Sequence, residues 1–216
     1  MRATLQQIFE RGPTKTYDKD DIIIFEGDYV NDLFYVESGY VKVYNFMNNG
    51  NERIIFVYSP GDVFPLTTHL TRREAAGYFY AAMTEVQVRT IKPAQLDEQL
   101  KNNIEKGEKL IEYINEVNQE FFQRIDVLSV NDTRRKIIAL FAFLAKKIGT
   151  EDDGGLIKID LPITHQDVAN MSGLTRESAS RQIATLKDEG LITGARKLSV
   201  NESKLEAMKE DMAIAE

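Results

Sequence analysis

Four glycines recur at intervals of 11 or 12 residues near the start of the chain, at positions 27, 39, 50 and 61. Each lies in a cluster of turn-forming residues, and the segments between them are rich in β-branched and aromatic residues, which favour strands. One of these segments, 40–46, alternates apolar and polar side chains, as a strand with one buried face does. Short strands at this spacing restrict the first part of the chain to a β-sandwich or a barrel.

The strand-rich block extends to about residue 93. We predict strands at 33–36, 40–46, 53–58, about 78–82 and 85–91. Lys92-Pro93 then ends the block, because the residue before a proline is restricted and proline cannot donate a ladder hydrogen bond. We therefore assign residues 1–93 to a β domain. The 216 residues suffice for one domain or for two modest ones.

From about residue 94 to residue 128 the pattern changes to that of a helix, with no proline and one glycine. Two rows of positions recur every seven residues, which is the spacing that a coiled coil requires. The opposite face is charged, and a helix of some 27 residues would extend about 40 Å, too far for a small barrel to cover. We therefore predict a dimerisation helix over 94–130; the alternative is an amphipathic helix that lies on its own β domain. The expected interface residues are Ile104, Ile111, Ile114, Asn118, Phe121, Ile125 and Leu128, with Gly107 in the same pattern.

Residues 131–216 form the last predicted domain, and segment 164–192 carries its most specific pattern. Thr164, with Asp167 three residues later, is expected to cap a short helix. Gly173 supplies a turn, and Thr175 is expected to cap a second helix that buries one apolar face. Two short helices joined in this way are typical of a helix–turn–helix. The buried face is expected to hold Ala179, Ile183 and Leu186, and residues 191–200 follow as a wing-like hairpin.

The second helix of this motif carries charged side chains at its N-terminal end. Arg can donate two hydrogen bonds to guanine, and Glu can accept one from the amino group of cytosine. Phosphates repel a carboxylate, so an exposed Glu177 between two arginines favours base reading; the alternative is a helical hairpin that only packs. The expected DNA-binding residues are Thr175, Arg176, Glu177, Ser180 and Arg181, with Arg196 and Lys197 near phosphates at the hairpin tip.

Charge is distributed unevenly along the chain. The formal net charge is −7, but residues 130–200 carry 11 Lys and Arg against 9 Asp and Glu. Residues 1–129 carry 14 against 20, and residues 201–216 carry 2 against 5. An anionic partner is therefore expected at 130–200.

Several chemistries are excluded by composition. The chain has no cysteine, which removes disulfides, thiolate nucleophiles and cysteine-bound metal clusters. Its two histidines, His69 and His165, lie far apart, and there is no glycine-rich phosphate loop, so we predict no enzyme. We see no apolar run of membrane-spanning length and no secretory signal, so we expect a cytoplasmic protein that does not enter the membrane.

In this order, the segments resemble the cAMP receptor protein/FNR (Crp/Fnr) family of bacterial transcription regulators over nearly the whole chain. The resemblance is most specific at 175–181, Thr-Arg-Glu-Ser-Ala-Ser-Arg. It implies an α+β fold with an N-terminal cyclic-nucleotide-binding-type β-roll (jelly roll), a long dimerisation helix and a C-terminal winged helix–turn–helix. It also implies a homodimer that binds an inverted repeat in double-stranded DNA and has RNA polymerase as a partner.

The resemblance leaves two half-sites open. Arg176, Glu177 and Arg181 match the Arg-Glu-x-x-x-Arg pattern with which cAMP-receptor-like members read a TGTGA-type half-site. Glu177, Ser180 and Arg181 also match the Glu-x-x-Ser-Arg pattern of FNR-like members, for which a TTGAT-like half-site is expected. The resemblance does not say whether the regulator activates or represses.

The resemblance fails where an effector would bind. Cyclic-nucleotide-responsive members use a glutamate to hold the ribose and an arginine to hold the cyclic phosphate. Here Leu66 stands in place of that glutamate and Ala76 in place of that arginine. A buried phosphate without its cation is costly, so we expect that cAMP is not bound in the usual way. In another register Arg72 or Arg73 would hold the phosphate. Without cysteine, the iron–sulfur cluster of FNR is also excluded.

The identity of any effector stays open at this point. An aromatic pocket in the β-roll would suit an apolar or planar ligand. The alternatives are that these residues are only core, that His69 binds a haem, or that no ligand exists. A further alternative, from another functional class, is a ligand-sensing module whose helical part binds a protein partner. The residues expected to frame the pocket are Tyr35, Tyr58, Leu66, Tyr78 and Tyr80.

Overall fold

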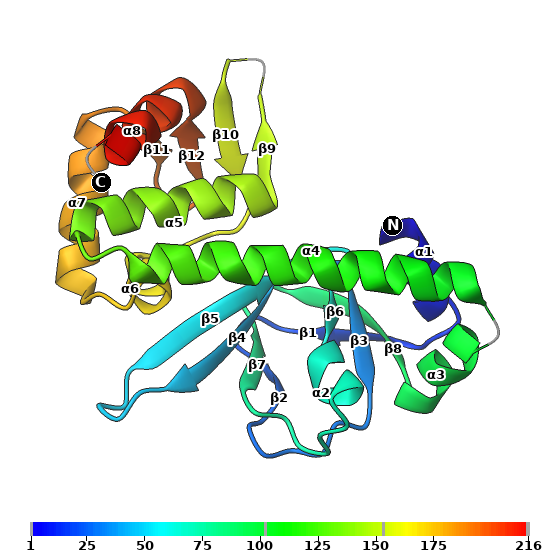
Figure 1. The fold of residues 1–216 in the computed structure, drawn as a ribbon. Helices are drawn as coiled ribbons and strands as arrows, with labels where there is room; N and C mark the ends of the chain where they lie inside the picture. The colour runs from blue at the N-terminus through cyan, green and yellow to red at the C-terminus, as the bar shows by residue number, and fades with distance from the viewer. Residues whose placement is uncertain (1, 102, 153, 215–216) are drawn as a thin grey trace. The chain divides into compact units, whose positions relative to one another are not determined.

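The computed structural model describes residues 2–101, 103–152 and 154–214, and the chain divides into two compact units, 1–119 and 120–216. The first unit contains most of the strands, and the second contains a helical motif with a small sheet (Figure 1). The long helix α4 (Ile104–Ser129) contributes residues to both units. The predicted mixed α+β fold is confirmed. None of the helices in the described ranges is long and apolar enough to cross a membrane.

Two four-stranded antiparallel sheets build the first unit, with strand orders β1-β8-β3-β6 and β2-β7-β4-β5. All five predicted strands are present, with ends that differ by a few residues. They are β3 (Leu33–Ser38), β4 (Val41–Phe46), β5 (Glu52–Tyr58), β7 (Phe79–Ala82) and β8 (Val86–Ile91).

Five shorter elements of this unit were not predicted. Each of the three strands is only two to four residues long, too short to show an alternating pattern. These elements are α1 (Arg2–Phe9), β1 (Thr14–Tyr17), β2 (Ile22–Ile24), β6 (Val63–Phe64) and α2 (Leu66–Leu70).

Apolar side chains from four helices close one side of the β-roll. The cluster contains Leu5, Ile8 and Phe9 of α1, Leu66 of α2, Leu96 of α3 (Pro93–Lys101), Leu110 and Tyr113 of α4, and the strand residues Leu33, Tyr35, Val63 and Ile91. Tyr113 is 2% exposed, and its hydroxyl oxygen accepts a hydrogen bond of 2.8 Å from the backbone N–H of Val63. The inner face of α4 is therefore fixed to β6 by both packing and a polar contact.

The prediction of one continuous helix over 94–130 was wrong. The structure has two helices instead, α3 and α4, and α4 begins at Ile104. The side-chain oxygen of Asn103 accepts a hydrogen bond of 3.0 Å from the backbone N–H of Lys106, as a residue before the first turn of a helix does. The break between α3 and α4 therefore lies before the seven-residue pattern, which starts at Ile104.

The second unit combines four helices, in addition to the end of α4, with a four-stranded antiparallel sheet of order β11-β12-β10-β9. The side chain of Asp132 caps α5 by accepting a hydrogen bond of 2.8 Å from the N–H of Arg135. The predicted hairpin at 191–200 is confirmed. The elements are α5 (Thr133–Ile148), β9 (Gly149–Glu151), β10 (Leu156–Ile159), α6 (His165–Ser172), α7 (Arg176–Asp188), β11 (Ile192–Gly194), β12 (Leu198–Asn201) and α8 (Glu202–Ile214).

We expect Tyr113→Phe to lower the free energy of unfolding of the first unit by about 1–3 kcal/mol, because the buried N–H of Val63 loses its acceptor. Urea unfolding monitored by circular dichroism measures this change. The control is Tyr29→Phe, the same chemical change at a side chain that is 70% exposed, and it should leave the midpoint unchanged. Equal midpoints for the two variants would show that the bond to Val63 contributes nothing.

Candidate nucleic-acid interface

Helix α6 begins at a reciprocal cap. The hydroxyl oxygen of Thr164 accepts a hydrogen bond of 3.1 Å from the N–H of Asp167, and the Asp167 carboxylate accepts one of 2.8 Å from the N–H of Thr164. The helix ends at Gly173, whose φ of 69° lies in the left-handed region that favours glycine. The capping box and the turn at Gly173 were both predicted from the sequence, and together they fix where α6 starts and stops.

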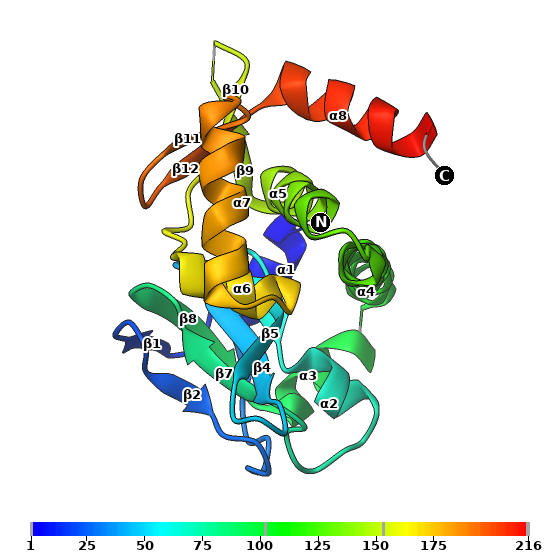
Figure 2. The ribbon, with the colours of Figure 1, turned by 90° about the vertical axis from the view of Figure 1, so that its left-hand side faces the viewer.

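Helix α7 crosses α6 steeply (Figure 2). Thr175 caps it, because its hydroxyl oxygen accepts a hydrogen bond of 3.2 Å from the N–H of Ser178. The predicted inner face of Ala179, Ile183 and Leu186 is buried. The predicted reading residues Arg176, Glu177 and Arg181 are all exposed.

Ser180 is half-buried among these charged side chains, and it is hydrogen-bonded across the motif. Its hydroxyl oxygen lies 2.9 Å from Nδ1 of His165, the first residue of α6. We did not predict this pair from the sequence, because the two residues lie fifteen positions apart and only the helix crossing brings them together.

The β11–β12 hairpin is attached next to the start of α6. The N–H of Ile163, one residue before the cap, donates a hydrogen bond of 3.0 Å to the carbonyl oxygen of Arg196. Gly194 has a φ of 90°, and a Cβ atom there would approach the carbonyl oxygen of Lys197 to 2.2 Å, so only glycine fits. Arg196 and Lys197 are therefore exposed in a tight turn beside the helix–turn–helix.

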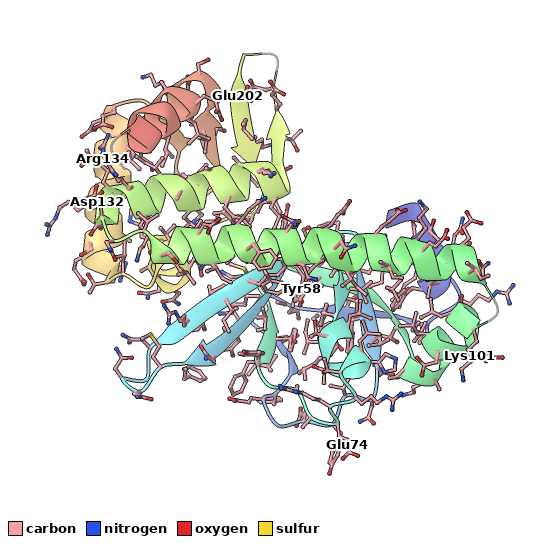
Figure 3. All side chains as sticks on the ribbon, viewed as in Figure 1. Tyr58, Glu74, Lys101, Asp132, Arg134 and Glu202 are labelled. Carbon is pink, nitrogen blue, oxygen red and sulfur yellow. The ribbon has the colours of Figure 1, made fainter. Side chains whose placement is uncertain are left out.

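Ionic contacts hold the far ends of both helices. Arg134 of α5 donates two hydrogen bonds, of 2.8 and 2.6 Å, to the carboxylate of Glu189 at the end of α7, and Figure 3 shows Arg134 at the start of α5. These bonds lower the pKa of Glu189. Arg124 of α4 is buried and donates a hydrogen bond to the carbonyl oxygen of Met171 near the end of α6. A cation there also complements the helix dipole. We had predicted neither contact.

The two predicted rows of α4 differ in exposure. Every residue of the row Ile104, Ile111, Asn118 and Ile125 is exposed, and every residue of the row Gly107, Ile114, Phe121 and Leu128 is half-buried. Part of the second row packs on the chain itself, since Ile114 lies against the apolar cluster of the first unit. Phe122, which we did not predict, is 60% exposed and follows Asn118 by one helical turn. The exposed apolar stripe therefore consists of the first row and Phe122.

The residues expected to frame an effector pocket differ in their surroundings. Tyr58 and Tyr80 stack on Phe64, with ring centroids 5.5 and 5.4 Å apart, which leaves no room for a planar ligand between the rings. Burial raises the pKa of the Tyr80 hydroxyl. Tyr35 contacts Phe9 in the apolar cluster instead, whereas Tyr78 is exposed.

The two positions that the resemblance assigns to cyclic-nucleotide contacts hold apolar, buried residues. Leu66 and Ala76 are both buried, and the N–H of Ala76 donates a hydrogen bond of 2.9 Å to the carbonyl oxygen of Asp28. Arg72 and Arg73 are exposed to solvent. Nε2 of His69 lies 2.9 Å from a carboxylate oxygen of Asp97. The described residues contain no group of three or more His, Cys, Asp or Glu side chains that would hold a metal ion.

Both units match known protein families. Residues 14–103 match the model of the cyclic nucleotide-binding domain, and residues 135–208 match that of the Crp-like helix-turn-helix domain. The transcriptional activator protein FnrL of Cereibacter sphaeroides is 24% identical over 193 residues, which cover 88% of this chain and 75% of that protein. The nitrogen fixation regulation protein FixK of Rhizobium meliloti is 23% identical over 194 residues, which cover 90% of this chain and 84% of that protein.

Solved structures show the same fold. FixK2 from Bradyrhizobium japonicum has a TM-score of 0.77 at 21% identity, over 91% of this chain and 96% of that one. A transcriptional regulator of the CRP family from Thermus thermophilus has a TM-score of 0.73 at 24% identity, over 89% and 95% of the two chains. The sequence and structural similarities thus extend across both units.

Proposed function

Because the chain belongs to the Crp/Fnr family of transcription regulators, we propose that it acts in the cytoplasm as a homodimer that reads an inverted repeat in duplex DNA. Members of this family are transcription regulators and not enzymes. The observation that carries the proposal is the first half of α7. Its inner face is buried, its start is capped, and three charged side chains project from it into solvent. This is the geometry with which a recognition helix enters the major groove.

The exposed stripe of α4 is the proposed contact between the two copies. Isolated apolar residues on a surface need no explanation, but a stripe at seven-residue spacing on one long helix is typical of a coiled-coil partner. Asn118 in the middle of the stripe would meet its own copy and set the register. A symmetric dimer of this kind places two recognition helices in successive major grooves, about 34 Å apart.

The proposed roles of the charged residues differ. Arg176, Glu177 and Arg181 read base edges, since their side-chain groups complement guanine and cytosine. Arg196 and Lys197 contact phosphates, because they are exposed at a turn beside the helix–turn–helix. Both a TGTGA-type and a TTGAT-like half-site fit this assignment. RNA polymerase is the expected partner of the regulator on the same DNA.

We further propose that cAMP is not the effector of this protein. The methyl group of Ala76 occupies a buried position at which a cyclic phosphate would need a cation, and Leu66 offers no acceptor for a ribose hydroxyl. The residues present therefore do not fit a bound cyclic nucleotide. The absence of cysteine leaves no ligands for an iron–sulfur cluster of the FNR kind.

The division between base and phosphate contacts predicts two different binding defects. Arg181→Ala should weaken binding to the selected operator by about 1–3 kcal/mol and relax the preference at one base position. Lys197→Ala should weaken binding to all sequences alike and reduce the slope of log affinity against log salt by about 1. In vitro selection of binding sites, followed by titration of each variant at several salt concentrations, measures both effects. Failure to select any palindrome would favour the alternative in which the helical part binds a protein.

The proposed dimer predicts that Ile111→Glu yields monomers that no longer bind the operator, because two buried carboxylates would face each other across the stripe. Sedimentation velocity measures the oligomeric state. Leu70→Glu is the matched control, since Leu70 is also exposed but lies outside the stripe, and it should leave the dimer intact. A wild-type protein that sediments as a monomer at micromolar concentration would exclude the dimer.

The apolar character of positions 66 and 76 predicts no specific binding of cAMP in calorimetric titration. The same titration with Ala76→Arg and Leu66→Glu together tests whether these two positions are the reason. Low-micromolar affinity of the wild-type protein for cAMP would contradict this part of the proposal.

A further inference from the structure

We propose that His165 is a specificity-determining residue, because its hydrogen bond to Ser180 decides whether Ser180 offers the DNA a hydrogen-bond donor or an acceptor. This inference rests on the proposed function of α7 as a DNA-reading helix. The observation behind it is the 2.9 Å distance between Nδ1 of His165 and Oγ of Ser180, which joins the first residue of α6 to the middle of the reading surface.

Ser180 occupies a central position on that surface. It follows Arg176 by four residues and Glu177 by three, so all three lie on one face of α7, and Arg181 comes next. Its hydroxyl has one proton and two lone pairs. The proton or lone pair that Ser180 shares with His165 is no longer available to a base in the groove. The hydrogen bond to His165 therefore holds α6 and α7 together. It also decides whether the Ser180 hydroxyl, which lies among the charged side chains of α7, can donate or accept a further hydrogen bond.

The polarity follows from the proton on His165. When the ring is neutral and Nδ1 carries a lone pair, the Ser180 hydroxyl donates its proton to Nδ1, and its oxygen is left as an acceptor. That oxygen then suits the amino group of adenine or cytosine. When the ring is protonated, Nδ1–H donates to the Ser180 oxygen, and the hydroxyl proton is free. It then suits an acceptor such as guanine O6 or N7, or thymine O4.

Histidine is the ordinary side chain whose charge changes between about pH 5 and pH 8, so the test below compares the two ends of that range. His165 is exposed and begins an α-helix, and its neighbours include both signs of charge. Arg124 and Arg134, from α4 and α5, bind at the opposite ends of α6 and α7. The charged groups on the elements around His165 are Asp167 of α6, which is held in the capping box, Arg176, Glu177, Arg181, Lys187 and Asp188 of α7, and Arg196 and Lys197 of the hairpin.

The test separates this effect from a general change in affinity. A proton on His165 adds a positive charge, which strengthens binding to every sequence alike. A change in the state of Ser180 alters the ratio of affinities for operators that differ at one base pair. Competition titrations with the operator and its single-base variants, at about pH 5.5 and about pH 8, give these ratios for the full-length protein.

Two variants identify the residues responsible. Ser180→Ala locates the base pair that Ser180 contacts, because the preference there becomes weaker. His165→Asn keeps a polar group near the position of Nδ1 but cannot titrate. For the wild-type protein we expect the preference at that base pair to shift by about three- to tenfold between the two pH values, from an amino-bearing base towards an acceptor. Neither variant should show the shift. Circular dichroism at both pH values checks that each variant is folded.

Each of the remaining outcomes would overturn either the inference about His165 or the proposed function. A wild-type preference that stays the same at both pH values, as a neutral ring with its proton on Nδ1 would give, overturns the inference and leaves DNA reading intact. A shift that persists in Ser180→Ala also overturns it, because another group must then read the base. Loss of all sequence preference in the wild-type protein at both pH values overturns the proposed function itself, and the inference with it.

Discussion

The long helix α4 has two apolar stripes, and the proposed mode of action depends on the fact that only one of them is used within the chain. Leu110 and Tyr113 bury the inner stripe against the β-roll. The outer stripe cannot turn inwards at the same time, because it lies on another side of the same rigid helix. Water therefore remains in contact with Ile111, Phe122 and Ile125 unless a second helix covers them. The proposed symmetric reader of inverted repeats depends on such a second helix.

Much of the architecture could be predicted because its determinants are local. Strands with alternating side chains, a capping box at Thr164 and Asp167, and the turn at Gly173 each depend on residues within a few positions of one another. The short strands escaped prediction, because two or three residues are too few to show a period. The break at Asn103 escaped prediction, because a capping asparagine cannot be distinguished from any other asparagine in the sequence. The exposure of Phe122 depends on which side of α4 meets the β-roll, and the heptad pattern alone could not reveal that side.

The candidate site also contains features that the sequence could predict and features that it could not. The exposed charges of α7 follow from helical periodicity, so the sequence sufficed to predict that Arg176, Glu177 and Arg181 are exposed. The bond between His165 and Ser180 and the burial of Arg124 required the three-dimensional crossing of helices. Of the tyrosines expected to frame a pocket, Tyr35, Tyr58 and Tyr80 are buried and Tyr78 is exposed. Composition alone could not distinguish rings that stack on each other from rings that surround a ligand.

Helix α7 uses different residues for folding and for the proposed contact with DNA. This separation affects how the sequence of such a protein can evolve. Folding depends on the cap at Thr175 and on the buried face of Ala179, Ile183 and Leu186. The outward positions contribute little to stability, because exposed substitutions away from caps and cores usually change it by no more than about 0.5 kcal/mol. New operator sequences can therefore be acquired by exchanging outward side chains one at a time, without an intermediate that fails to fold.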